Sequence, residues 1–89
     1  MTNRTRTMFE RRAFRGIRRG MICASCDAVG HVLKVTQVVD LFGRTYVEAQ
    51  STMNGQYVEG RDKDFVYRVS QPDLFARIVS GNFNPATGQ

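Results

Sequence analysis

The chain has 89 residues, of which 42% are hydrophobic, a composition typical of one small globular domain with a modest core. Eight glycines, two prolines and two cysteines argue against a disordered or disulfide-dense chain. No apolar run approaches the roughly 18 residues that a membrane span needs, and the polar start lacks a signal-peptide pattern. We therefore expect a cytoplasmic protein that makes no membrane contact.

The net charge of +5 is concentrated at the start of the chain. Residues 1 to 20 carry seven arginines and one glutamate, a net charge of +6, whereas residues 21 to 89 are nearly neutral at −1. A block of one sign at a terminus is typical of a segment that contacts other molecules. The arginines of this arm are Arg4, Arg6, Arg11, Arg12, Arg15, Arg18 and Arg19.

The arm is expected to contain a short basic helix that begins at Met8 and ends at about Arg15 or Ile17. Thr7 and Glu10 have the spacing of a capping box, in which each side chain satisfies the other residue's backbone amide. Helical spacing gives the segment one apolar and one basic face. The apolar positions are Phe9, Ala13 and Ile17, and the basic positions are Arg11, Arg15 and Arg18.

From Gly20 onward the pattern is that of short β-strands. We expect strands at 21–24, 31–39, 44–51, 56–59 and 65–69, with turns at 40–43 and 60–64. In the third strand Thr45, Val47 and Ala49 should lie on one face, with Tyr46, Glu48 and Gln50 on the other. In the fifth strand Phe65, Tyr67 and Val69 should share one side. Asn54-Gly55 predicts a type I′ turn, which needs positive φ at both central residues.

A second helix should begin after Ser70, which we expect to cap it, with Pro72 and Asp73 in its first turn and Gly81 at its end. The expected fold is mainly β: a small five-stranded barrel with a short N-terminal basic helix and a C-terminal helix. We expect the arm at 1–19, the barrel with its helix at 20–81, and a tail at 82–89. The predicted core is Ile22, Val32, Val35, Val47, Phe65, Tyr67, Leu74 and Ile78.

The chain resembles an SH3-like barrel of the KOW type over roughly residues 18 to 69. Such domains open with a glycine, a strand and a loop, and then enter the second strand through a Gly-x-Val-x-x-Val step. Gly20-Met-Ile stands at the opening here, and residues 30–35 (GHVLKV) match the step. Met21 replaces the aspartate usual after the first glycine. The resemblance implies an SH3-like fold and a partner that is nucleic acid or a nucleoprotein complex.

Cys23, Cys26 and His31 match the first three ligands of a retroviral-type zinc knuckle. The fourth ligand is missing, because neither Val35 nor Thr36 is a cysteine, and structural zinc is almost always four-coordinate. We therefore expect no metal or other cofactor, and interpret Cys23 as a small core residue. Cys26 and His31 could be written as a nucleophile and a base, but no third orienting group is visible, so we do not expect an enzyme.

The sequence favours a non-catalytic binding module. In the first hypothesis the arginines of the arm contact phosphates of nucleic acid or of a ribonucleoprotein, and Tyr46 and Tyr57 stack on bases. In the second, the chain is a small regulator or inhibitor, of the kind carried by phages and other mobile elements, which docks on an acidic protein surface with Met8, Phe9 and Phe14 buried in the partner. A third possibility is an accessory subunit of a larger assembly. A solvated arm without a partner is the plain alternative.

Overall fold

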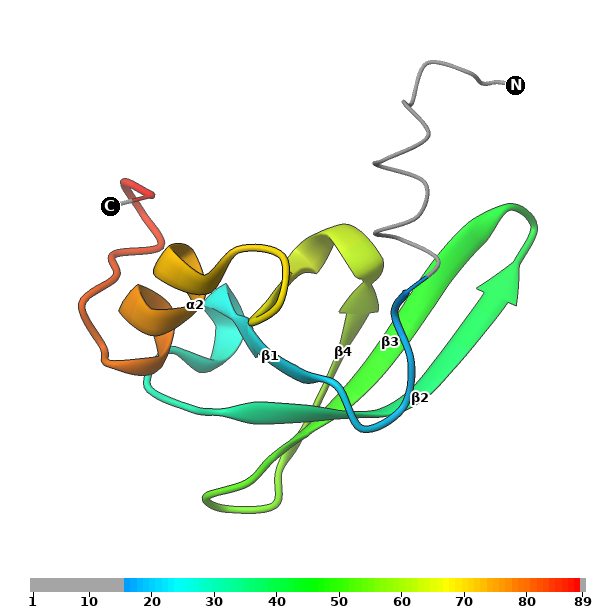
Figure 1. Ribbon diagram of the computed structural model, residues 1–89, viewed down its shortest axis with the longest axis horizontal. Helices are drawn as coiled ribbons and strands as arrows, with labels where there is room; N and C mark the ends of the chain where they lie inside the picture. Colours follow the sequence, from blue (N-terminus) through cyan, green and yellow to red (C-terminus); the bar gives the residue numbers. More distant parts are fainter. Residues whose placement is uncertain (1–15, 89) are drawn as a thin grey trace.

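The computed structural model describes residues 16–88 (Figure 1). The predicted basic helix, its capping box at Thr7 and Glu10, and its apolar positions Phe9 and Ala13 lie outside this range. Ile17, the last apolar position, is buried and is not helical. No helix in the described range is long and apolar enough to cross a membrane.

The described chain forms one five-stranded antiparallel sheet with the strand order β4-β3-β2-β1-β5, followed by one α-helix. The mainly β fold and its C-terminal helix are confirmed. The strands are β1 (Ile22–Ser25), β2 (Leu33–Leu41), β3 (Arg44–Ser51), β4 (Tyr57–Arg61) and β5 (Phe65–Tyr67), and the helices are the 3-10 turns η1 (Cys26–Ala28) and η2 (Asp62–Asp64) and the α-helix α2 (Pro72–Val79). Hydrogen-bonded closure of the barrel is not found, because β4 and β5 stand at opposite ends of the order and η2 connects them.

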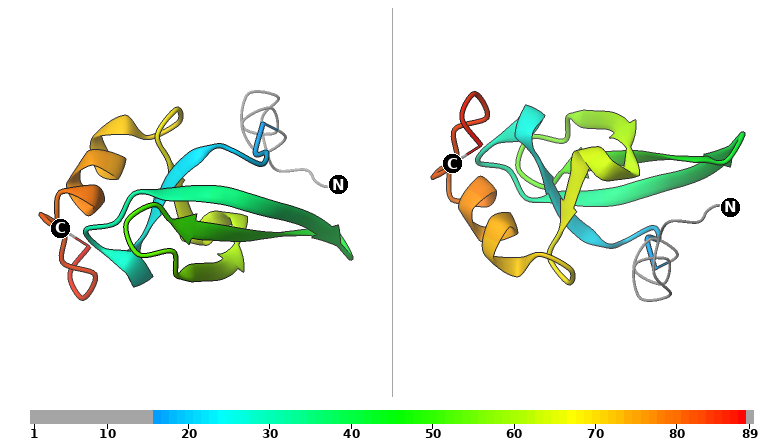
Figure 2. Two further views of the ribbon diagram at one scale, coloured as in Figure 1. Left: turned by 90° about the horizontal axis from the view of Figure 1, so that it is seen from below. Right: turned by 90° about the horizontal axis from the view of Figure 1, so that it is seen from above.

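Strand β1 has both faces covered, which divides the buried residues into two clusters. Cys23 faces the main core, which residues of β2, β3 and β5 also line, so we call this side of the sheet the core face. Ala24 faces the other way, onto Phe75 and Ile78 of α2. We call that side the outer face. Helix α2 and the tip of the β2–β3 hairpin lie at opposite ends of the molecule (Figures 1 and 2), so the helix leaves the outer face of the hairpin uncovered.

Alternation along β3 agrees with the prediction, since Val47 and Ala49 are buried on the core face. Five of the eight predicted core residues are buried: Val35, Val47, Phe65, Tyr67 and Ile78. Ile22, Val32 and Leu74 are only partly buried, in the second cluster beneath α2. The predicted core omits the buried residues Ile17, Ala24, Leu33 and Phe75, whereas the interpretation of Cys23 as a core residue and the placement of Ala49 on the face of Val47 are confirmed. The prediction failed around β1 because a strand covered on both faces shows no alternation of apolar and polar residues.

The two hairpin turns differ from the prediction. Strand β2 continues through Leu41, which pairs with Arg44, so the turn is only Phe42-Gly43, with φ of 53° and 76°. Asn54 does not have positive φ, whereas Gly55 does, and the Gly55 amide donates to the Ser51 carbonyl at 3.0 Å. The predicted type I′ turn at Asn54-Gly55 is therefore wrong, and the type I′ backbone occurs at Phe42-Gly43 instead.

The chain after β4 also departs from expectation. Gly60 and Arg61 belong to β4, and the expected charged turn is shortened to η2. Strand β5 ends at Tyr67, so Val69 does not join its buried face and is 78% exposed. The Ser70 hydroxyl donates to the Tyr67 carbonyl at 3.3 Å instead of capping the helix. Helix α2 does begin at Pro72.

The end of α2 follows the prediction at Gly81. Its φ is +84°, its amide donates to the Ile78 carbonyl, and the Asn82 amide donates to the Arg77 carbonyl at 3.0 Å. These two bonds form a Schellman motif, which requires the left-handed backbone that glycine adopts without strain. Phe83 then packs against the second cluster, and the Arg77 guanidinium lies 5.6 Å from the centre of its ring.

The position of Val47 in the core predicts that Val47→Ala lowers the free energy of unfolding by about 1–3 kcal/mol, because it leaves a cavity that the sheet cannot fill. Urea denaturation measures the loss. Val39→Ala is the matched control, since Val39 lies on the exposed outer face of the adjacent strand. An equal, small loss in both variants would contradict this assignment of faces.

Candidate binding surface on the outer face of the sheet

The basic arm joins the described structure beside β2. Ile17 is buried in the main core, and the Gly20 amide donates to the Val35 carbonyl at 2.7 Å. Arg18 and Arg19 are exposed at this junction. The other predicted nucleic-acid contacts of the arm, and its predicted protein anchors, lie outside the described residues: Arg4, Arg6, Met8, Phe9, Arg11, Arg12, Phe14 and Arg15.

A row of side chains crosses the sheet on the outer face at the start of β2. Lys34 pairs with Ile22 on one side and with Gln50 on the other, and Gln50 pairs with Tyr57. Arg68 continues the row next to Ile22, whose carbonyl accepts from the Arg68 amide at 3.1 Å. We call these five residues the basic row. Directly opposed positions share one face of a sheet, so the two cations and the tyrosine of this row face the same side.

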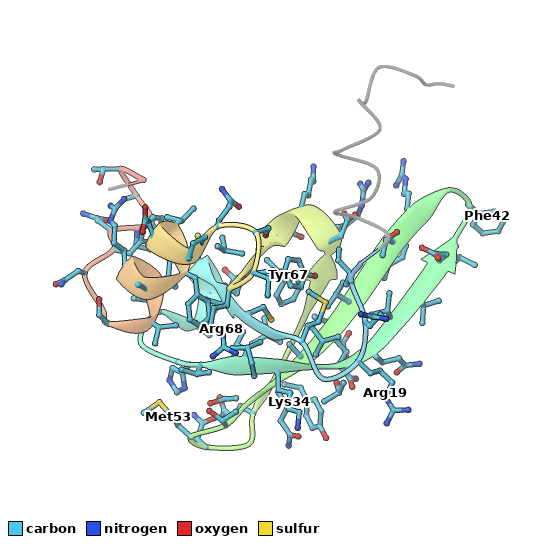
Figure 3. The ribbon with its side chains drawn as sticks, in the orientation of Figure 1. Arg19, Lys34, Phe42, Met53, Tyr67 and Arg68 are labelled. Atoms are coloured by element: carbon cyan, nitrogen blue, oxygen red, sulfur yellow. The ribbon has the colours of Figure 1, made fainter. Side chains whose placement is uncertain are left out.

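The basic row is continuous with the root of the arm. Figure 3 shows Arg19 and Lys34 extending from the same side of the molecule. Lys34, Arg68 and Arg19 are all exposed, and the Tyr57 ring is 58% exposed. Exposed cations next to an exposed aromatic ring can hold a phosphate chain and stack on one of its bases.

Tyr46 does not belong to the basic row. It pairs with Val39 and Arg61, two rows further along the hairpin on the same outer face. The row between the two tyrosines holds Glu48 directly opposite Glu59. Two carboxylates repel phosphate. The structure therefore places Tyr57 in the same row as Lys34, with Gln50 between them, but separates Tyr46 from this row by negative charge.

The two glutamates line a hollow of about 200 Å³ together with Gln37, Val39 and Tyr46. Like charges directly opposite each other in a sheet destabilise it, so this pair opposes folding. Glu48 accepts a hydrogen bond of 2.6 Å from the Thr36 hydroxyl. Among residues 16–88 no ion pair neutralises either carboxylate.

The tip of the β2–β3 hairpin is apolar and exposed. Phe42 is 93% exposed, and Leu41 before it is 49% exposed. Phe42 also has a φ of +53°, a conformation that is rare and costly for a bulky side chain. Figure 3 shows its ring at the far end of the hairpin. Phe42 lies in the turn predicted at 40–43, where no functional residue was expected. An aromatic residue next to a glycine between two strands is a sequence signal for an exposed tip.

His31 is held in a second hollow near η1, where its Nδ1 lies 2.8 Å from the Ser51 hydroxyl. That hydroxyl oxygen also accepts from the backbone amides of Met53 and Asn54, at 3.1 and 3.3 Å. The Nδ1 atom of His31 is therefore engaged by Ser51.

The candidate zinc ligands are not assembled. Cys23 is fully buried in the main core, whereas Cys26 is exposed in η1. Within the described range no group of three or more His, Cys, Asp and Glu side chains lies close enough to hold a metal ion. Burial raises the pKa of the Cys23 thiol from 9.0 to about 12. Burial also raises the pKa of Tyr67, and the negative charges of Cys23 and Asp62 add to that effect.

These two pKa shifts predict a loss of stability at high pH. Above pH 9.0 the unfolded chain releases the Cys23 proton, whereas the folded chain keeps it up to about pH 12, so the free energy of unfolding falls across this interval. The slope is at most about 1.4 kcal/mol per pH unit for one group. Urea denaturation at a series of pH values measures it, and Cys23→Ala should flatten the slope just above pH 9.0.

Thiol labelling checks the same arrangement independently. In the folded protein a maleimide should modify Cys26 alone, and Cys23 only after denaturation. Equal labelling of both thiols under native conditions would contradict the burial of Cys23.

Comparison of the chain with protein-family models, curated proteins and solved structures finds no match. The function is therefore argued from the arrangement of the residues themselves.

Proposed function

We propose that the protein is a non-catalytic nucleic-acid-binding module, and that the observation which carries this assignment is the basic row. Lys34 and Arg68 lie in one row with Tyr57 on an exposed sheet face, and Arg19 extends from the same side. The arm that precedes Arg19 in the sequence adds six more arginines. Phosphates contact the cations while a base stacks on the tyrosine.

We further propose that the fold is an SH3-like barrel of the KOW type. Gly20, the first glycine of the KOW-type pattern, and Gly30, the glycine of its Gly-x-Val-x-x-Val step, both have a φ of +91°. Glycine favours this backbone conformation, which supports the match at both positions. Residues of β3 and β5 share one core cluster although β2 and β1 lie between these strands in the sheet. This is expected if the sheet curls around the core. The ribonucleoprotein partner that this resemblance implies is part of the same proposal.

The exposed hairpin supports a second candidate function, a protein-binding regulator or an accessory subunit. Phe42 and Leu41 are large apolar residues at a projecting tip, and interfaces often bury an aromatic anchor. A protein partner would make the hairpin, rather than the basic row, the surface on which affinity depends.

Titration of the full chain against duplex DNA and structured RNA at two salt concentrations tests the first function. A double variant in which glutamine replaces both Lys34 and Arg68 should bind more weakly. Its slope of log K against log salt should be smaller by roughly two units, because each phosphate that the protein no longer contacts keeps about one counterion. Tyr57→Ala should weaken binding by about 1–3 kcal/mol without changing the slope, since stacking releases no counterions.

Lys63→Gln is the matched control, because Lys63 is an exposed cation in η2 and lies outside the basic row. Equal losses for Lys63→Gln and for the Lys34/Arg68 variant would mean that net charge alone drives binding. Absence of any binding at about 50 mM salt would rule out the nucleic-acid function, since a segment of this charge binds phosphate at least non-specifically.

A further inference from the structure

A hollow of about 270 Å³ lies at the end of the sheet where β3 ends and β4 begins. We call it the η1 hollow, because η1 forms one of its walls. It is smaller than the pockets that hold drug-sized molecules, and this size suits a flat group such as one nucleobase. The polar residues that line it are Asp27, His31, Ser51, Asn54, Gln56 and Tyr57.

The η1 hollow adjoins the basic row, because Tyr57 belongs to both. Tyr57 pairs with Gln50 on the outer face, whereas Ser51 is buried on the core face, so the hollow opens around the end of the sheet. Strand β4 is the edge strand, and no further strand of the described sheet separates the hollow from the row. Lys34 is two strands away from Tyr57, about 10 Å at the usual strand spacing. Figure 3 shows Met53, in the loop before β4, on the same lower side of the molecule as Lys34.

Hydrogen bonds within the chain hold the walls of the η1 hollow and leave other polar groups for a ligand. The Ser51 hydroxyl lies 2.8 Å from His31 Nδ1 and accepts from the Asn54 amide at 3.3 Å. Asn54 Oδ1 accepts from the Gln56 backbone amide at 3.0 Å, so the Asn54 side chain keeps its amide donors for a ligand. Among residues 16–88 no hydrogen bond or ion pair engages the Asp27 carboxylate.

The charge of these walls favours a base over a phosphate. No lysine or arginine lines the η1 hollow, and the Asp27 carboxylate would repel a phosphate. A carboxylate contains only acceptors, so it selects a ligand that presents donors.

Guanine is the standard base that matches a carboxylate best. Its Watson–Crick edge presents two adjacent donors, N1–H and the N2 amino group, to the two oxygens of one carboxylate. The neighbouring O6 atom is an acceptor for the side-chain amide of Asn54 or Gln56. Uracil, cytosine and adenine each place an acceptor beside their donor, and that acceptor would face one of the carboxylate oxygens.

We propose that the η1 hollow binds an unpaired guanine, with the Asp27 carboxylate accepting from N1–H and from the N2 amino group. This base preference rests on the proposed nucleic-acid function, since phosphates on the basic row bring the neighbouring base to Tyr57 and the guanine into the hollow. Base pairing would occupy the Watson–Crick edge of the guanine, so the strand is single-stranded here. Asp27 then determines which sequence the module prefers, whereas the cations of the basic row contribute affinity for any sequence.

Fluorescence anisotropy with three short RNAs tests the proposal. The RNAs are oligouridines that differ only at one central nucleotide, which is guanosine, inosine or uridine; inosine lacks only the N2 amino group of guanosine. The wild-type chain should bind the guanosine RNA at least about fivefold more tightly than either of the others. This comparison uses the wild-type chain and does not depend on the folding of any variant.

Asp27→Asn should reduce this preference to less than about twofold, because an amide cannot accept from both donors. It also removes a negative charge, so the uridine RNA should bind as tightly as before or more tightly. A carboxylate that acted only through its charge would instead affect all three RNAs alike. Asp73→Asn is the matched control, because it removes the same charge from α2, outside the hollow, and should keep the preference.

Free guanosine monophosphate carries the same base without the neighbouring phosphates, so it should bind at least about tenfold more weakly than the guanosine RNA. Equal affinity for the two would overturn the assignment to a nucleic-acid strand. Equal binding of the three RNAs by the wild-type chain would overturn the guanine site and leave the nucleic-acid function standing, and so would a preference that survives in Asp27→Asn. Absence of binding to all three RNAs would contradict the nucleic-acid function itself, and the guanine site with it.

Discussion

The fold depends on the position of β1 in the middle of the sheet. This strand of four residues pairs with β2, which follows it closely, and with β5, whose Tyr67 opposes Cys23 from a distant part of the sequence. Cys23 and Ala24 are both fully buried, one toward the main core and one toward α2. A larger residue at either position would separate the layers, and a charged one would be buried without a partner.

That central strand also determines which side of the sheet is available for binding. The core face is filled by the main cluster, and α2 covers the outer face over β1 and β5. The outer face of β2, β3 and β4 is left exposed, and its rows differ in charge. Lys34 lies in one row, Glu48 and Glu59 lie in the next, and Arg61 lies with Val39 and Tyr46 in the third. The basic row lies near the root of the arm, whereas the Glu48–Glu59 hollow and Phe42 lie toward the hairpin tip.

The sequence predicted which side chains are buried where a strand has one buried and one exposed face, so that apolar and polar residues alternate. Alternation in β3 assigned Val47 and Ala49 to the core and Tyr46 and Glu48 to the outer face, because that strand has one wet side. The prediction failed at β1, where both faces of the strand are buried. It also failed at Ser70, whose hydroxyl donates to the Tyr67 carbonyl instead of capping the helix. The type I′ turn was predicted in the wrong hairpin. The Ser51 hydroxyl oxygen accepts hydrogen bonds from the backbone amides of Met53 and Asn54, and these bonds stabilise a longer loop there.

The candidate site was harder to predict because it depends on register. Tyr46 and Tyr57 are exposed on the sheet, but only the strand pairing reveals that Glu48 and Glu59 separate them. Lys34 and Arg68 are distant in sequence, and they share a row only because β1 lies between β2 and β5. The exposed hairpin tip at Phe42, in contrast, could be predicted from the sequence, because an aromatic residue stands there next to a glycine between two strands.

The most direct test of the account is a ¹H–¹⁵N NMR titration of the full chain with a short single-stranded RNA at low salt. The largest amide shift changes should follow the basic row, at Lys34, Gln50, Tyr57 and Arg68, and extend to Arg18 and Arg19 at the root of the arm. Amides of α2 and of Phe42 at the hairpin tip should change little. Shift changes centred on Tyr46, Glu48 and the hairpin tip, with the basic row unaffected, would contradict it.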